Sequence, residues 1–229
     1  MLTLAFDTSA KTAAVALLKN KEIIYDKIIR TQMTHSEVIL PQINEAMEKS
    51  GVNISEVDLF ACSLGPGSFT GLRVAVSTLK GMILALSKPA VGVSSLAALA
   101  LNIINTDKLI CSVIDAGRGQ VYTSLFNYDD AGILQQITPE QAVWPQNVLS
   151  KNVNGDVVCV GDGALKYENI IKGTNKSEVI IAQNNIIKAS SIGILGLEKC
   201  RRNELLNPDN CVPVYLRIAD AKPMKVDTI

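Results

Sequence analysis

The chain has 229 residues, a length that fits one large or two small α/β domains. Hydrophobic residues make up 48% of it and charged residues 19%, which indicates a packed core and argues against global disorder. The 22 basic and 22 acidic residues cancel, whereas a protein that binds RNA by itself usually carries an excess of basic side chains against the phosphates. Any RNA contact is therefore expected to be shared with a partner.

Three further features favour the cytoplasm. No apolar run in the sequence reaches the roughly 18–20 residues that span a bilayer, so no membrane segment is expected. The N-terminus has no basic segment and reaches a charge at Asp7, which is unlike a signal peptide. The five cysteines are scattered and form no Cys-x-x-Cys pair, which favours reduced thiols over a disulfide or a zinc site.

The first part of the chain predicts three strands followed by an alternation of helix and strand. The first three apolar segments are joined by short turns, which is typical of an antiparallel meander. Thr34 and Glu37 then form a capping-box pattern, Gly51 ends the helical spacing that follows, and Pro41 is expected to kink this helix or shift its start. The expected strands cover residues 2–6, 12–18, 22–30, 57–63 and 91–93, and the expected helices 36–50, 72–86 and 95–104.

The order of elements then begins again. A strand ends at Asp115, a glycine turn follows, and a second meander leads to a further strand and the glycine loop at residues 161–163. The expected strands cover residues 109–115, 121–127, 133–138 and 157–160, and residues 139–150 are expected to be helical.

The two halves therefore resemble a duplication. Phe6-Asp7-Thr8 and Ile114-Asp115-Ala116 both place an Asp at the end of a first strand, before a turn into the second. The predicted fold class is α/β, the actin-like ATPase (ASKHA) fold with mixed sheets. Its two ribonuclease-H-like halves would be residues 1–105 and 106–229, the second reduced, facing each other across a cleft.

Both aspartates can be interpreted in two ways. A carboxylate at the C-terminal end of a strand can hold a metal–phosphate complex. An Asp in this position also caps a turn by accepting hydrogen bonds from backbone N–H groups. The spacing of Asp7 and Asp115 leaves both interpretations open.

The segment from Gly65 to Gly71 follows a strand and opens a helix, where backbone N–H groups form an anion site. No Gly-Lys-Ser/Thr follows, so this is not a P-loop, and a tight turn explains the glycines equally well. Arg73 lies near enough to contact an anion or a carboxylate of a partner.

The helix at residues 72–86 is apolar nearly all round, which predicts burial nearly all round. Either one face covers the sheet and another meets a second subunit, or the helix is buried within one subunit. Gly81 and Ala85 would allow a close backbone approach. Leu72, Val76, Leu79 and Ile83 make one face, and Val74, Thr78, Gly81 and Ala85 lie opposite.

His35 is the only histidine of the chain. A metal site that needs two imidazoles therefore cannot be built from this chain, and a catalytic triad would have to use His35. We expect no catalytic residue and no metal ligand.

Several stretches, in order over essentially the whole chain, together resemble the TsaB (YeaZ) family. The most specific is Gly65-Pro66-Gly67-Ser68-Phe69-Thr70-Gly71-Leu72-Arg73. The others are Leu4-Ala5-Phe6-Asp7-Thr8-Ser9, Thr34-His35-Ser36-Glu37 with Leu40-Pro41, Gly92-Val93-Ser94-Ser95-Leu96, Ile114-Asp115-Ala116 with Val121-Tyr122, and Pro213-Val214-Tyr215-Leu216-Arg217.

The resemblance implies a non-catalytic scaffold subunit of the tRNA threonylcarbamoyladenosine synthase, which modifies the adenosine beside the anticodon. It implies pairing with a TsaD-like paralogue that carries the metal-binding histidines, a TsaE-like ATPase as a further partner, indirect contact with tRNA, and a homodimer when isolated. It implies no cofactor of its own, with ATP and Mg²⁺ bound at the interface of the complex.

The resemblance also implies positions for two sites. The degenerate nucleotide cleft would contain Asp7, Thr8, Ser9 and Asp115. The subunit interface on the first two helices would contain Ile39, Ile43, Met47, Leu72, Arg73, Val76, Leu79, Lys80 and Ile83.

Two alternatives differ in kind from a scaffold. A small actin-like ATPase or kinase acting alone would use Asp7, Asp115 and the two glycine loops. A metallopeptidase is less favoured, because the sequence has no histidine pair.

Overall fold

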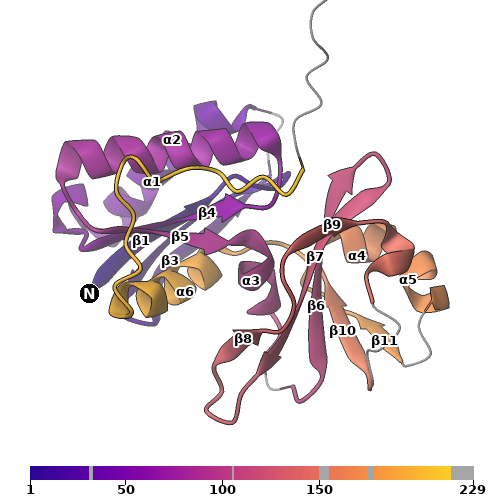
Figure 1. Ribbon diagram of the computed structural model, residues 1–229. Coiled ribbons are helices and arrows are strands. Elements are labelled where there is room, and N and C mark those ends of the chain that lie inside the picture. The colour runs from indigo at the N-terminus through magenta and orange to yellow at the C-terminus, as the bar shows by residue number, and fades with distance from the viewer. Residues whose placement is uncertain (31–32, 105, 150–154, 175–177, 218–229) are drawn as a thin grey trace, which may run out of the picture.

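The computed structural model describes residues 1–30, 33–104, 106–149, 155–174 and 178–217, arranged as two halves that each contain one sheet (Figure 1). In the first sheet the strand order is β3-β2-β1-β4-β5; β1, β2 and β3 are antiparallel neighbours, and β4 and β5 run parallel to β1. Its strands are β1 (Leu2–Asp7), β2 (Ala13–Lys19), β3 (Glu22–Ile29), β4 (Leu59–Gly65) and β5 (Ala90–Ser94).

Helices cover both faces of this sheet, with α1 (His35–Ser50) and α2 (Phe69–Leu86) on one face and α6 (Ala189–Arg201) on the other (Figure 1). Side chains alternate along the central strands accordingly: Leu4 and Phe6 pack under α1 and α2, whereas Ala5 faces α6. The α6 face carries small residues, and glycines of α6 meet it closely, since a Cβ built at Gly196 would lie 2.9 Å from the Ala61 side chain.

The ends of α1 form as the sequence predicts. The backbone N–H of Thr34 donates to the Glu37 carboxylate at 2.8 Å, which completes a capping box, and Gly51 ends the helix in the left-handed region at φ 64°. Pro41 lies inside α1, which nevertheless begins at His35, so the proline does not shift the start.

The second sheet has the order β11-β10-β6-β7-β8, with β9 paired to β7. One face packs on α4 (Asp162–Lys166) and α5 (Glu168–Thr174), and the other joins α3 (Ser95–Ala100) in a core that also contains residues of the first sheet. The strands are β6 (Leu109–Gly117), β7 (Gln120–Tyr128), β8 (Leu134–Gln136), β9 (Gln141–Val143), β10 (Val157–Val160) and β11 (Val179–Ile181).

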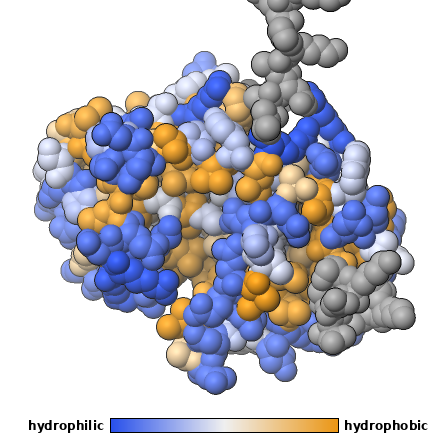
Figure 2. Space-filling model, viewed as in Figure 1, coloured by the Kyte–Doolittle hydropathy of each residue, from blue (hydrophilic) through white to orange (hydrophobic). Residues whose placement is uncertain are grey.

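This duplicated arrangement is the actin-like fold that the element order predicts. Strands of the first sheet precede residue 105 and those of the second follow it, whereas α6, from the second segment, packs on the first sheet. Figure 2 shows a hollow with apolar surface where the halves meet, and residues of α3, α6 and the β7–β8 hairpin line a groove there. The division at residue 105 stays a prediction as a domain boundary.

The prediction of a helix at residues 139–150 is wrong for the described part, which ends at residue 149. Residues Gln141–Val143 form β9, antiparallel to β7, and Pro145–Asn147 form a short 3₁₀ turn. Pro145 lacks the N–H group that a helix interior needs, so pairing of residues 141–143 with β7 satisfies the backbone better. The predicted helix at residues 95–104 is also shorter than expected, since α3 ends at Ala100.

One sequence expectation about membranes changes with α2. Over its 18 residues the mean hydropathy is 1.4, so by length and composition alone this helix could cross a membrane, a weak signal that core helices share. Leu72, Ala75, Val76 and Leu79 of α2 are buried, and the last three pack in the core that also contains side chains of β1 and β4. Core packing therefore explains the apolar residues on one side of α2, but not those on its outward side.

Candidate functional site

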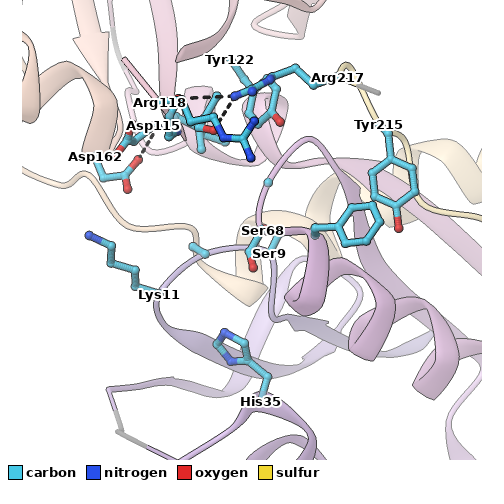
Figure 3. Close-up of a pocket in the computed structure, with 16 residues that line it drawn as sticks. Ser9, Lys11, His35, Ser68, Asp115, Arg118, Tyr122, Asp162, Tyr215 and Arg217 are labelled. Atoms are coloured by element: carbon cyan, nitrogen blue, oxygen red, sulfur yellow. Dashed lines mark hydrogen bonds between the residues drawn. The ribbon is translucent and has the colours of Figure 1, made fainter. Parts of the chain in front are cut away.

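A cleft of about 580 Å³ lies between the two halves (Figure 3). The first half contributes the loop after β1 and the N-terminal ends of α1 and α2. The second half contributes the end of β6, the β6–β7 turn and the start of α4, and the C-terminal segment adds Tyr215 and Arg217. Of the four predicted cleft residues, Ser9 and Asp115 line this cavity, whereas Asp7 and Thr8 lie behind it.

Asp7 ends β1 as a fully buried carboxyl group. Its Oδ1 accepts hydrogen bonds from the Ser63 hydroxyl and, at 3.1 Å, from the Ser9 N–H, while Oδ2 has no partner among the described residues. Burial raises the pKa of Asp7, and the hydrogen bonds from Ser63 and Ser9 oppose that rise. The geometry matches the turn-capping interpretation.

Thr8 and Ser9 tie the first turn to the glycine loop. The Thr8 hydroxyl donates to the Gly71 carbonyl at 2.7 Å, and the Ser68 N–H donates to the Ser9 carbonyl at 2.7 Å. A Cβ at Gly71 would lie 1.8 Å from the Thr8 carbonyl oxygen, so only glycine permits this approach. The loop is therefore held as a tight strand-to-helix turn, and the Ser68 N–H is not available to an anion.

Asp115 lies in the cleft but is already engaged. Its Oδ2 forms an ion pair with the Lys166 ammonium at 2.7 Å, and its Oδ1 accepts from the Gly117 N–H at 3.1 Å. Asp162 accepts the Asp115 N–H at 3.0 Å, which fixes the end of β6 to the start of α4. The hydrogen bond to Asp115 raises the pKa of Lys166. Lys166 and Asp162 were not predicted, although the glycine loop around Asp162 marked the position.

These residues do not fit a Mg²⁺–nucleotide complex held by strand-end carboxylates. Mg²⁺ is bound through one or two carboxylates together with substrate phosphates. Asp7 is buried behind the turn, and an ammonium group occupies the place beside Asp115 that a cation would take. Within the described part of the chain, no three His, Cys, Asp or Glu side chains are grouped to hold a metal.

His35 begins α1 and lines the cleft. Its Nδ1 is buried without a hydrogen-bond partner among the residues that the structure describes. Ser9 and Ser68 line the same cavity, but the Ser9 hydroxyl accepts from Ser95 at 3.2 Å and the Ser68 hydroxyl accepts the Gly71 N–H as helix cap. Neither serine has a hydrogen bond to His35 in the structure, so no nucleophile–base pair forms here.

A second hollow, a groove of about 730 Å³, runs between α1 and α2 on the outside of the first half. Val74, Gly81, Met82 and Ala85 of α2 line it, together with Leu40 of α1. No atom lies within 4 Å of a Cβ built at Gly81, so the helix backbone is open to an approaching surface. The groove therefore lies on the α2 face that the sequence predicts to be opposite the buried one.

The predicted interface residues divide between the core and the surface. Arg73 is exposed, and Lys80 and Ile83 are half-buried. Six others are buried within the chain, and of these Ile39 also lines the groove. The six are Ile39, Ile43, Met47, Leu72, Val76 and Leu79. They are buried because the apolar face of an amphipathic helix turns first to its own sheet, and their part in an interface stays a prediction. An interface on α1 and α2 stays a prediction.

Comparisons with known proteins bear on the whole chain. The family model described as "TsaD: tRNA N6-adenosine threonylcarbamoyltransferase" matches residues 27–222. A "tRNA threonylcarbamoyladenosine biosynthesis protein TsaB" from Bacillus subtilis is 32% identical over 100% of this chain and 99% of its own length. The chain belongs to the TsaB family.

Solved structures agree with this membership. YeaZ from Pseudomonas aeruginosa superposes with a TM-score of 0.81 at 26% identity, over 94% of this chain and 99% of that one. Component A of (R)-2-hydroxyglutaryl-CoA dehydratase from Acidaminococcus fermentans has a TM-score of 0.53 at 12% identity, over 88% and 99%, a likeness of fold alone. The TsaB-family chain thus keeps the two-sheet fold while its strand-end aspartates are engaged within the protein.

Proposed function

We propose that this TsaB-family chain is a non-catalytic subunit of the machinery that makes threonylcarbamoyladenosine in tRNA. It would pair with a TsaD-like transferase subunit through the groove between α1 and α2 and hold that subunit in an active shape. The names of the matching family and relative support the pathway. The observation that carries the pairing is the outward face of α2, which is apolar and open although its opposite face already fills the core.

The outward face has the properties of a helix-packing surface. Leu84 is 69% exposed, Gly81 and Ala85 are exposed, and the groove beside them presents mostly apolar surface, with Arg73 and several hydroxyl side chains among its lining residues. Small residues let a second helix backbone approach closely, and exposed apolar patches on monomers mark interaction sites. A specific interface of this kind buries on the order of 1,600 Å² in total. In the isolated chain, the same face would form a homodimer.

The cleft and the charge of the chain suggest how nucleotide and tRNA would be bound in the complex. Asp7 and Asp115 are engaged within the protein, so we assign no nucleotide to this chain; ATP and Mg²⁺ would bind at the interface of the complex, which a TsaE-like ATPase joins. With no net charge, the chain would contact tRNA only through the complex. A cytoplasmic location would follow from this function.

Reconstitution tests the function. Threonylcarbamoyl transfer to tRNA would be measured with TsaD, TsaE and threonylcarbamoyl-adenylate, with and without this chain, and ATP turnover by this chain alone would be measured in parallel. We expect modification to require the chain and the chain alone to hydrolyse no ATP. Modification that proceeds equally well without it would refute the scaffold role, and ATP turnover lost in Asp7→Ala would favour an independent enzyme.

Two glycine-to-arginine substitutions test whether the groove between α1 and α2 is the partner surface. Gly81→Arg places a long cation in the groove without a clash inside the chain, because nothing lies within 4 Å of its Cβ. Gly173→Arg in α5 is the matched control, since Gly173 is also helical and equally open. We expect Gly81→Arg to abolish co-purification with TsaD and Gly173→Arg to leave it unchanged, with equal melting temperatures. Retained binding by folded Gly81→Arg would place the interface elsewhere.

A further inference from the structure

The C-terminal segment from residue 211 to residue 217, here called the strap, places Tyr215 and Arg217 in the lining of the cleft. On the first half, the Val214 N–H donates to the Leu64 carbonyl at the end of β4, at 2.7 Å. On the second half, the Arg217 guanidinium donates to the Ala116 and Gly117 carbonyls of the β6–β7 turn, at 3.0 and 3.4 Å. The strap is therefore anchored on both halves, and the side chain between the anchors is held in place.

That side chain, Tyr215, stacks on the first residue of α2. Its ring centroid lies 4.7 Å from that of Phe69, with 33° between the ring planes, and the Arg73 guanidinium carbon lies 3.9 Å from the Phe69 centroid on α2. Phe69 is 39% exposed and Tyr215 is 41% exposed. A cation, two rings and the strap thus form one ordered stack at the surface, which leaves much of its apolar area in water.

The stack continues the groove between α1 and α2. Arg73 lines that groove from the same helix turn as Thr70, whereas Phe69 and Tyr215 line the cleft, so the stack joins the two hollows. Among the described residues Arg73 has no carboxylate within ion-pair distance. A guanidinium held over a ring, without an acidic neighbour, is preorganised to receive a carboxylate from outside.

We propose that the partner surface extends from the groove onto this stack. The TsaD-like subunit would pack an apolar side chain against the Tyr215 ring and place an acidic side chain on Arg73. Tyrosine and arginine are among the residue types enriched at the interface positions that contribute most binding energy. A side chain that is already fixed by its anchors also loses little conformational freedom on binding. This inference rests on the proposed function, since the partner is the one that occupies the groove.

The test measures the dissociation constant of the full chain with its TsaD-like partner. Tyr215→Ala and Arg73→Met are each expected to weaken binding by about tenfold or more, and the effect of Arg73→Met should shrink at high salt. Trp144→Ala removes an aromatic side chain that is 50% exposed on the second half, and it should change nothing. Arg73→Met keeps the exposed aliphatic stem, so it carries the test if Tyr215→Ala lowers the melting temperature.

The outcomes separate the two proposals. If Gly81→Arg abolishes binding while Arg73→Met and Tyr215→Ala both leave the constant within twofold, the partner stops at the groove and this inference is wrong. If folded Gly81→Arg still binds, the proposed pairing itself fails. Loss in Trp144→Ala equal to that in Tyr215→Ala would also overturn the inference, because the effect would not be local to the stack.

Discussion

Leucine-to-alanine changes at two positions of α2 give the sharpest check on which face of this helix is buried. Leu79 is 0% exposed and Leu84 is 69% exposed, so one substitution removes core packing and the other removes mostly hydrated surface. Fully burying a leucine contributes about 1.5–3 kcal/mol, and the cavity left behind adds to the loss, so Leu→Ala in a core costs about 2–5 kcal/mol. Leu84→Ala should cost roughly 1 kcal/mol or less.

Urea unfolding followed by circular dichroism, together with calorimetry, measures both effects. At about 2–4 °C per kcal/mol for a chain of this size, Leu79→Ala should lower Tm by about 4–20 °C and Leu84→Ala by only a few degrees. Binding of the partner by Leu79→Ala should be near normal below its Tm, because the side chain lies inside the chain. If Leu79→Ala were as stable as the unmodified protein but no longer bound its partner, Leu79 would lie on the partner-facing side of α2 and the assignment of the buried face would be wrong.

Four further substitutions test the cleft and the helices. Burial raises the pKa of Asp7 above its ordinary 3.8. The carboxyl therefore contributes stability below about pH 3.8, and this contribution is lost as pH rises through the raised pKa. In urea unfolding, Asp7→Asn should be more stable than the unmodified protein at about pH 7, and the difference should shrink toward about pH 4. Lys166→Met breaks the ion pair with Asp115, in which the lysine side chain is 50% exposed, so we expect a small loss of stability that vanishes in about 1 M salt. A loss that is undiminished in about 1 M salt would contradict a screened pair. Gly71→Ala should destabilise the protein strongly, because its Cβ would lie 1.8 Å from a carbonyl oxygen. Gly81→Ala has open space around its Cβ and should stabilise the isolated chain by up to about 1 kcal/mol. Similar thermal stabilities of the two variants would refute this contrast.

Local patterns in the sequence predicted most of the first half. The meander of β1, β2 and β3 was predicted by short turns between apolar runs, and the ends of α1 by Thr34, Glu37 and Gly51. These features depend on residues close in the chain, where backbone conformation and capping decide the outcome. The prediction for residues 141–143 failed for the opposite reason, because their strand depends on pairing with β7, about twenty residues earlier in the chain.

The sequence by itself determined the two-half organisation, the apolar character of α2 all round, and the restriction to a single histidine. Only the tertiary structure decided which side of α2 is buried: six of the nine predicted interface residues lie in the core, and the open face carries Gly81, Leu84 and Ala85 instead. It also decided that Asp7 caps a turn and that Lys166 binds Asp115. Periodicity reports that a side chain is apolar or charged, but its partner lies far along the chain, and only the packing of sheets and helices brings the two together.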